Sequence, residues 1–447
     1  GGVMRLLWVN HASFVVQAGP IRMITDPWLE GTAFNDGWRL LTPSKFRYED
    51  FADITHIWFS HEHPDHFSPP NLRRIPEEYR RRITVLFHAT RDRRVLNFCE
   101  SLGFRVQELP HNQPVELAGG VSMVCGPQGL LDSWMALTES GQTLLNMNDC
   151  VFDPEDLTSI KERVGAVDVL LSQFSYATWV GNEGDVASHR RHAEDKLAEM
   201  SRQIQIFAPR RFIPFASYIY FSHAENSYMN QAVNRIADVY RYVQEKLGCE
   251  TVVLFPEDTW EVGKPQDSTA AIGSYTAAME AALADAPDLS RVVTLGELEQ
   301  AAAAFVQRSE RRNNRVLLKL IPAAVVRVTD LGIDVEFSYR RGLRQVAGRQ
   351  PEVSLSSDSL FYCLEFDWGG NALEINGRYQ VFPRKNPERF FQILRVPEHN
   401  ISGERLEEVV AKKALRWARR AFGGLLPRGH KTPAHQPHGP ARTAGAR

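Results

Sequence analysis

The sequence predicts an α+β protein in which two β-sheets carry helices on their outer faces and a smaller α+β lobe follows. Three observations support this fold class. The chain opens with short strands in hairpins, strands then alternate with helical segments, and new strand patterns begin beyond about residue 314. With 447 residues and 43% hydrophobic content, the chain can bury one large core and a second, smaller one.

The first strands are expected within residues 5–28, where apolar residues alternate and a turn at Ala18–Gly19–Pro20 separates two strands. Short apolar runs that end at turn residues predict further strands after this hairpin. In chain order these runs read ITHIWFS, ITVLF, VSMVC, SWMAL, QTLLNM and VDVLLS.

The helical spacing of apolar residues predicts helices between and after these strands. The longest is expected from Ser227 to Leu247, because Ser227 can cap its first turn and Gly248 can end it. Four further helices are expected over residues 91–102, 190–204, 269–286 and 295–311.

Changes in composition divide the chain into three parts. We expect a first domain over residues 3–300, a C-terminal α+β lobe over residues 301–422 and a tail over residues 423–447. The tail is rich in Pro, Gly and Arg, which is typical of a disordered segment. Its histidines are therefore expected to add solubility rather than to bind metal.

The overall charge favours neither nucleic acid nor an anionic membrane as a partner, because 52 Lys and Arg residues balance 54 Asp and Glu residues. No apolar run is long enough to cross a bilayer, and the N-terminus lacks the pattern of a signal peptide. We therefore expect a cytoplasmic protein. Its five cysteines form no CxxC pair, so neither a disulfide framework nor a thiolate metal site is indicated.

A cluster of metal-binding residue types, HEHPDH, follows an apolar strand between His61 and His66. His61 and His63 are two residues apart and project toward the same side, while the turn at Pro64 lets Asp65 and His66 aim at a second point nearby. Imidazole and carboxylate groups suit zinc or iron. The segment therefore predicts ligands for two adjacent cations.

This HxHxDH pattern after a strand, with ITDPW before it, resembles the metallo-β-lactamase superfamily. The segments FSHEHPDHFS, LLNMNDC and FIPFASYIYFSH further resemble the metallo-β-lactamase-like part of the CMP-N-acetylneuraminate hydroxylase family, over roughly residues 5–230. The resemblance implies that residues 3–300 form a catalytic αββα sandwich with its site along one edge.

The resemblance also implies the remaining ligands. His61 and His63 would bind the first metal, and Asp65 and His66 the second. Asp149 falls where the superfamily places the carboxylate that bridges the two metals, and it is the expected catalytic residue. His223 falls where the last histidine of the second metal is expected.

One position departs from the superfamily pattern. Gln128 stands where a third histidine for the first metal is expected. Three alternatives follow: Gln128 supplies an amide oxygen, another side chain substitutes, or the first metal is loosely held. His189 and His192 are possible substitutes, because their spacing places them on one helix face. His11, on the first hairpin, also lies where the superfamily often has a residue near the site.

Two kinds of enzyme fit this ligand set. A hydroxide held between two zinc ions would hydrolyse a phosphoester, lactone or thioester. Iron with open coordination positions would use dioxygen to hydroxylate a substrate. The resemblance to hydroxylases, and to non-heme diiron monooxygenases of this fold, favours two metal ions, iron rather than zinc, with dioxygen as co-substrate. A metal-free binding protein is a third hypothesis, because of Gln128.

Many aromatic residues are expected around the rim of the site, which favours a bulky small-molecule substrate such as the terpenoid or acyl-CoA-like scaffolds of natural-product biosynthesis. The resemblance to the sialic acid hydroxylases normally includes a Rieske iron–sulfur domain, but this sequence has none of the paired Cys and His motifs that such a cluster needs. We therefore expect electrons to come from a separate reductase or ferredoxin.

Overall fold

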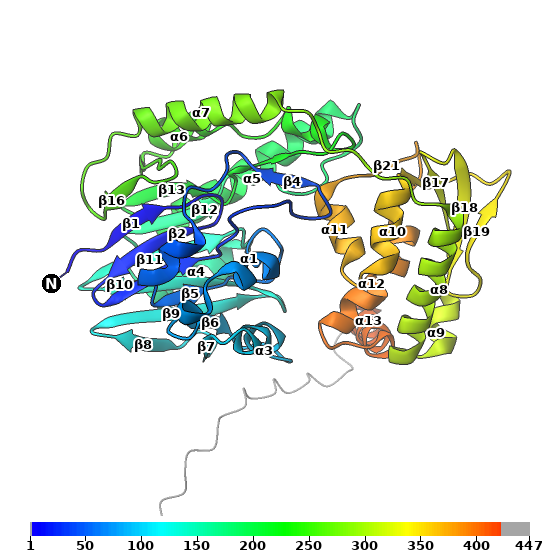
Figure 1. Ribbon diagram of the computed structural model, residues 1–447, viewed down its shortest axis with the longest axis horizontal. Coiled ribbons are helices and arrows are strands. Elements are labelled where there is room, and N and C mark those ends of the chain that lie inside the picture. Colours follow the sequence, from blue (N-terminus) through cyan, green and yellow to red (C-terminus); the bar gives the residue numbers. More distant parts are fainter. Residues whose placement is uncertain (1, 422–447) are drawn as a thin grey trace, which may run out of the picture.

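The computed structural model describes residues 2–421, and two seven-stranded β-sheets form the centre of its larger part (Figure 1). The first sheet has the order β16-β1-β2-β3-β5-β6-β7. Its strands are β1 (Arg5–Trp8), β2 (Phe14–Ala18), β3 (Ile21–Thr25), β5 (His56–Trp58), β6 (Thr84–His88), β7 (Arg105–Leu109) and β16 (Thr259–Glu261). The neighbouring strands β3, β5, β6 and β7 of this sheet are parallel, so their carboxyl ends lie at one edge of the sheet.

The second sheet has the order β15-β13-β12-β11-β10-β9-β8. Its strands are β8 (Pro114–Ala118), β9 (Val121–Gln128), β10 (Asp132–Glu139), β11 (Gln142–Asn148), β12 (Val169–Gln173), β13 (Arg211–Phe215) and β15 (Glu250–Thr251). Buried side chains of both sheets, among them Met23 and Trp58 from the first and Met135 and Leu171 from the second, share one core. The sheets therefore pack face to face.

Helices cover both outer faces of this pair of sheets. Two further cores lie under them, one on each face. The first face carries α1 (Pro69–Arg74), α2 (Glu77–Arg80), α3 (Arg94–Ser101) and a 3-10 helix (Tyr48–Asp53). The second carries α4 (Pro154–Val164), α5 (Val186–Phe207), α6 (Ile236–Lys246) and α7 (Thr269–Ala284). The predicted αββα sandwich is confirmed.

The long helix predicted from Ser227 to Leu247 is wrong at its first half. A 3-10 turn (Ser227–Asn230) and an irregular segment precede α6, which begins only at Ile236. Asn230 donates its side-chain amide to the carbonyls of Phe221 and Ser227, and these bonds favour a turn over a continuous helix.

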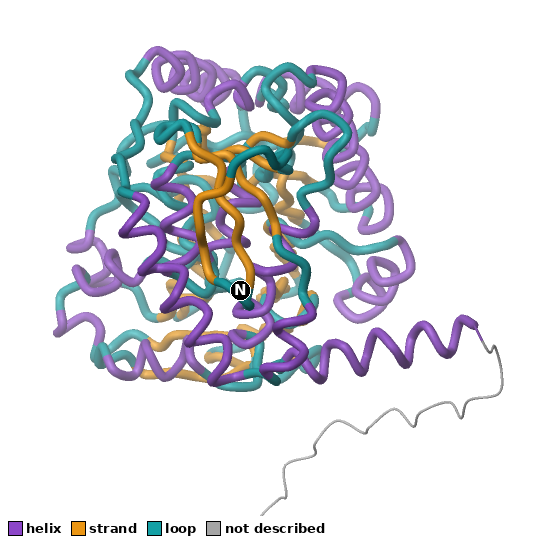
Figure 2. Tube along the Cα trace, turned by 90° about the vertical axis from the view of Figure 1, so that its right-hand side faces the viewer, coloured by secondary structure: helices purple, strands orange, loops and turns teal. Residues whose placement is uncertain are grey.

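The C-terminal lobe has its own core and a five-stranded sheet of order β19-β18-β17-β20-β21. Its strands are β17 (Ala324–Val328), β18 (Ile333–Ser338), β19 (Gly342–Val346), β20 (Val353–Leu355) and β21 (Gln380–Val381). Its helices are α8 (Leu295–Arg312), α9 (Arg315–Leu320), α10 (Ser357–Glu365), α11 (Gly369–Asn376), α12 (Glu388–Ile401) and α13 (Leu406–Ala421). Figure 2 shows α13 projecting from the body of the molecule.

The boundary between the core of the larger domain and the core of the C-terminal lobe lies earlier in the chain than the predicted boundary at residues 300 and 301. The core under α7 ends at Ala282, and the core of the C-terminal lobe begins at Val293. The predicted boundary falls inside α8, whose buried residues pack in the C-terminal lobe. The tail predicted over residues 423–447 lies outside the described residues. No described helix is both long and apolar enough to cross a membrane.

A buried hydrogen-bond network joins the lobes. The loop before β4 (Trp38–Leu40), a strand that pairs with β14 (Ile219–Phe221), contacts the end of α11: Asn376 donates to the carbonyl of Phe34 at 3.0 Å. Gly37 is required at this contact, because a Cβ there would lie 2.5 Å from that of Asn376. The adjacent Arg378, fully buried, pairs with Glu225 at 3.0 Å and with Asp358 at 3.1 Å.

Replacing this arginine tests the contact between the lobes. Arg378→Met leaves two carboxylates without their buried partner, and we expect the free energy of unfolding to fall by about 3–5 kcal/mol. Equilibrium urea unfolding measures the change. Lys385→Met, at an exposed position of the same lobe, is the matched control and should change the stability little. Equal stability of the two variants would contradict a role for Arg378 in joining the lobes.

Candidate metal centre

The loop that carries HEHPDH leaves the carboxyl end of β5 and is anchored by Asp26, which follows the neighbouring strand β3. Asp26 is fully buried, and its carboxylate accepts hydrogen bonds from the backbone N–H and the hydroxyl of Ser60, each at 2.7 Å. It also accepts a bond from Nδ1 of His66 at 2.8 Å. One carboxylate therefore fixes both the start and the end of the histidine-rich loop.

A first cluster combines His61, His63 and Asp149, whose ligand atoms lie within 4.8 Å of one another. Nε2 of His61 is 3.1 Å from Nδ1 of His63 and 3.6 Å from Oδ2 of Asp149. Asp132, at the start of β10, lies 3.1 Å from Nδ1 of His61. A proton held on Nδ1 by this carboxylate leaves the Nε2 lone pair facing the cluster, which is the arrangement that a metal ligand needs.

A second cluster combines Asp65, His66 and His11, again within 4.8 Å. Oδ2 of Asp65 lies 3.1 Å from Nε2 of His66 and 2.9 Å from Nε2 of His11. The Nδ1–H of His66 donates a hydrogen bond to Asp26, so Nε2 of His66 also faces the cluster. His11 differs, because its Nδ1 accepts the backbone N–H of Tyr218 at 3.2 Å. Its proton is then on Nε2 and is donated to Asp65, so His11 orients a ligand.

Asp149 links the two clusters. Its Oδ2 lies 3.6 Å from Nε2 of His61 and 3.6 Å from Nε2 of His66. The residue follows β11 at an irregularity in the pairing of β11 with β12, where Asn148 adopts a positive φ of 39°. The Asn148 side chain accepts the N–H of Asp149 at 2.7 Å and donates to the carbonyl of Ser133 at 2.9 Å. This local turn places the carboxylate between the two groups of histidines.

Two carboxylate oxygens of the two clusters are buried without a hydrogen-bond partner. They are Oδ1 of Asp65 and Oδ1 of Asp149. Buried carboxylate oxygens without partners are costly unless a cation or another polar group compensates them. These atoms therefore fit a site for two metal ions, with His61, His63 and Asp149 toward one and Asp65, His66 and Asp149 toward the other.

Burial and neighbouring charges set the pKa values in this cluster without metal. Burial lowers the pKa of His61, but the carboxylates of Asp132 and Asp149 outweigh it and raise the pKa to about 9. Burial and the charge of His61 lower the pKa of His63 to about 4. Burial opposes the charge of Asp149, yet His61 and His66 lower its pKa to about 2. At neutral pH and without metal, Asp149 is therefore negatively charged and His63 is neutral. His61 is protonated on both ring nitrogens and carries a positive charge.

Other predicted site residues lie outside the two clusters. His223 is buried and lies 3.2 Å from Glu225, in the network that joins the lobes. The segment that carries it follows β14 and is held by Asn226, which donates to the carbonyls of Gly37 and Asn376. Gln128 donates its amide to the carbonyl of Val151 instead of pointing among the histidines. His189 contacts the carbonyl of Asn182 at 2.7 Å through its Nε2.

His192 is the one member of the predicted extra ligands that lines the cleft beside the metal centre. Its Nδ1 donates to the carbonyl of Ser188 at 2.8 Å, which leaves Nε2 as an acceptor. The cleft has a volume of about 370 Å³ and is bounded by aromatic residues, by α5 and by the C-terminal lobe. Residues that line it include His63, Asp65, Asp149, Phe34, Trp38, Tyr176, Lys196 and Ile375.

The sequence analysis did not assign Asp26 and Asp132, which both shape the centre. It placed His11 near the site but did not predict that His11 orients Asp65. A signal for Asp26 is present, since it directly follows a predicted strand that runs parallel to the strand before His61. Asp132 gives no such signal, and the resemblance placed His11 near the site without its contact to Asp65, because both contacts depend on how β10 and the first hairpin pack against β5.

The pKa of His61 predicts how metal binding depends on pH. A metal must displace the proton of this imidazole, so its apparent affinity should rise with pH up to about 9, by up to tenfold per unit for one proton. Competition with a chelator for zinc at several pH values measures this slope. Asp132→Asn removes the first carboxylate that raises this pKa and should reduce the slope between pH 7 and 9. An affinity that does not change with pH would contradict the assignment.

Asp26 should control metal affinity without touching the metal. Asp26→Asn removes the charge that orients His66 and should weaken zinc or iron binding by about 10–100-fold. Chelator competition checks the effect, and circular dichroism checks that the variant folds. Asp156→Asn, on the exposed face of α4, is the control and should bind metal normally. Normal affinity in Asp26→Asn would show that this carboxylate is only structural.

Comparison with known proteins gives the family of the larger domain. Residues 22–215 match the family model for the beta-lactamase superfamily domain. The chain is 25% identical over 248 residues to the cytidine monophosphate-N-acetylneuraminic acid hydroxylase of Danio rerio, which covers 52% of this chain and 41% of that protein. It is 26% identical over 226 residues to a putative Rieske 2Fe-2S iron-sulfur protein of Mycolicibacterium smegmatis, which covers 47% of this chain and 41% of that protein.

The matched region thus spans less than half the length of these two curated relatives. Similar solved structures include CmlA, a diiron beta-hydroxylase from Streptomyces venezuelae, at 18% identity and a TM-score of 0.40, covering 58% of this chain and 54% of that one. Another is an isothiocyanate hydrolase from Delia radicum gut bacteria, at 14% identity and a TM-score of 0.42, covering 58% and 100%. Residues 22–215 thus match a beta-lactamase superfamily domain, and the two packed sheets with helices on both outer faces agree with that match.

Proposed function

We propose that this protein is a non-heme diiron monooxygenase that hydroxylates a bulky small molecule. The observation that carries the proposal is the pair of clusters that share Asp149, each with two further ligand groups. A site with few protein ligands for each cation keeps positions open, which dioxygen chemistry requires. When bound, the two iron ions would supply the activation of dioxygen.

The curated relatives support oxygenation over hydrolysis. The relative from Danio rerio, which matches this chain over 248 residues, is a hydroxylase by name. A dinuclear zinc hydrolase of a phosphoester, lactone or thioester is the alternative. It is favoured by the His61, His63 and Asp149 set, because three protein ligands with an open position are also typical of catalytic zinc.

The cleft supports a substrate with an apolar, bulky part. Phe34, Trp38 and Tyr176 supply an aromatic wall, and Ile375 supplies an aliphatic contact from α11. The polar side comes from α5, where Lys196 pairs with Glu199 at 3.2 Å. A terpenoid or acyl-CoA-like scaffold fits this division, since its apolar part would bind the aromatic wall and its polar end would face α5.

His192 is the side chain that we propose to move protons in this cleft. Its Nδ1 proton is fixed by the carbonyl of Ser188, so Nε2 is free to accept a proton from the substrate or from water. The residue lies on α5 and lines the same cleft as Asp149. Electrons for the reaction would come from a separate reductase or ferredoxin, in keeping with the iron–sulfur proteins among the relatives.

Metal analysis of anaerobically purified protein tests the proposal. We expect close to two iron ions per chain, and dioxygen consumption when a chemical reductant and a bulky apolar substrate are added. Asp149→Ala should lose at least one of the two metals, because its carboxylate serves both clusters. Asp153→Ala, which removes only the cap of α4, is the control and should keep both.

Each alternative gives a different result in the same measurement. Two zinc ions together with hydrolysis of a lactone or thioester would establish the hydrolase instead. A folded protein that binds neither iron nor zinc would contradict both enzyme proposals.

A further inference from the structure

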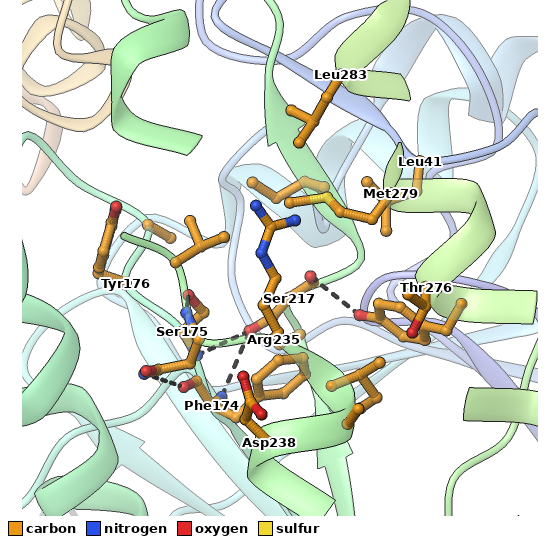
Figure 3. A pocket seen from close by; sticks show the side chains of 18 of the residues that line it. Leu41, Phe174, Ser175, Tyr176, Ser217, Arg235, Asp238, Thr276, Met279 and Leu283 are labelled. Atoms are coloured by element: carbon orange, nitrogen blue, oxygen red, sulfur yellow. Dashed lines mark hydrogen bonds between the residues drawn. The ribbon is translucent and has the colours of Figure 1, made fainter. Parts of the chain in front are cut away.

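A second cavity lies away from the metal centre, between α6, α7 and the segment that follows β12 (Figure 3). Its volume is about 380 Å³, within the range of about 300–1,000 Å³ that is usual for small-molecule sites. Most of its lining is apolar, and none of the residues of the two metal clusters contributes to it. The apolar residues include Leu41, Phe174, Ile219, Val233, Met279 and Leu283.

Arg235, immediately before the first turn of α6, is the cation of this cavity. Its guanidinium points toward Met279 and Leu283 and away from Asp238 (Figure 3). Among the described residues its hydrogen bonding consists of one long contact, 3.4 Å, to the carbonyl of Asn230. A half-buried guanidinium beside apolar side chains, without a carboxylate within ion-pair distance, can bind an anion with several N–H donors.

Ser217 supplies a second donor. Its Oγ accepts the backbone N–H groups of Phe174 at 3.4 Å and of Ser175 at 3.2 Å. With both of these bonds made to the oxygen, the hydroxyl proton remains available to a ligand. The cavity therefore offers a charged donor and a neutral donor within a mostly apolar wall.

Two carboxylates also line the cavity, but neither neutralises Arg235. Asp238 and Glu280 both lie at exposed positions of their helices, and Asp238 pairs with Arg241 at 3.4 Å. Exposed carboxylates are screened by water, whereas the guanidinium points toward the apolar side chains of Met279 and Leu283 (Figure 3). Among the described residues neither carboxylate is within ion-pair distance of Arg235, so its guanidinium is available to an anion.

We propose that this cavity binds an amphipathic organic anion. Its carboxylate or phosphate would be held by Arg235 and Ser217, and its apolar tail would lie against Met279 and Leu283. Tyr176 and Ala177 line both this cavity and the metal cleft, so the bound molecule would lie one chain segment away from the reaction site. The proposal goes beyond the proposed function and does not depend on which metal the protein binds.

Isothermal titration calorimetry of the full chain tests the proposal with decanoate, decyl phosphate and decanol, each below its micelle concentration. Both anions should bind at least about tenfold more tightly than decanol, because a charged hydrogen bond to arginine is added to the same apolar contact. The ratio of the two anion affinities tells which head group the site prefers. Absence of binding by both anions at millimolar concentration would overturn the proposal.

Four variants locate the binding. Arg235→Gln should weaken both anions about tenfold and leave decanol unchanged, whereas Lys246→Gln, the same loss of charge on α6 outside the cavity, should change nothing. Thr276→Trp, from an exposed position that lines the cavity, should fill it and abolish all binding. His61→Ala should leave binding intact. Unchanged binding in Arg235→Gln or in Thr276→Trp, or its loss in His61→Ala, would place the anions elsewhere and overturn the proposal.

Discussion

The placement of one carboxylate, Asp149, between two groups of histidines is the constraint on which the candidate site depends. Its Oδ2 lies at the same distance, 3.6 Å, from His61 and from His66. Concentrating so many ionisable groups in a buried place is unfavourable unless cations compensate them. The fold sustains this arrangement because the carboxyl ends of β3, β5 and β11 bring their loops to a common edge.

Residues behind the ligands matter as much as the ligands themselves. Asp26 orients His66, Asp132 orients His61, and the Nε2 proton of His11 is directed at Asp65. These three contacts determine which ring nitrogen carries a proton, and hence which lone pair can face a metal. The C-terminal lobe has a different role: it contributes Ile375 to the cleft and is held in place by the buried charges around Arg378.

Local patterns predicted much of this structure. Alternating apolar residues located most strands of the sandwich, and the dense spacing of HEHPDH predicted that four potential ligands meet after one strand. The structure differs from these patterns where tertiary contacts determine the local conformation. Asn230 ends a pattern that would otherwise continue as a helix, because its amide bonds to Phe221 across the chain. His223 satisfies the expected order along the sequence, but its loop turns toward Glu225 and the C-terminal lobe.

We propose that two neighbouring cations share Asp149. Anomalous X-ray diffraction from iron-loaded crystals, recorded on both sides of the iron absorption edge, tests this arrangement. Two iron peaks about 3.5–4 Å apart, one beside His61 and His63 and the other beside Asp65 and His66, are the predicted result. A single peak away from Asp149, or no iron peak within reach of these side chains, would contradict the account.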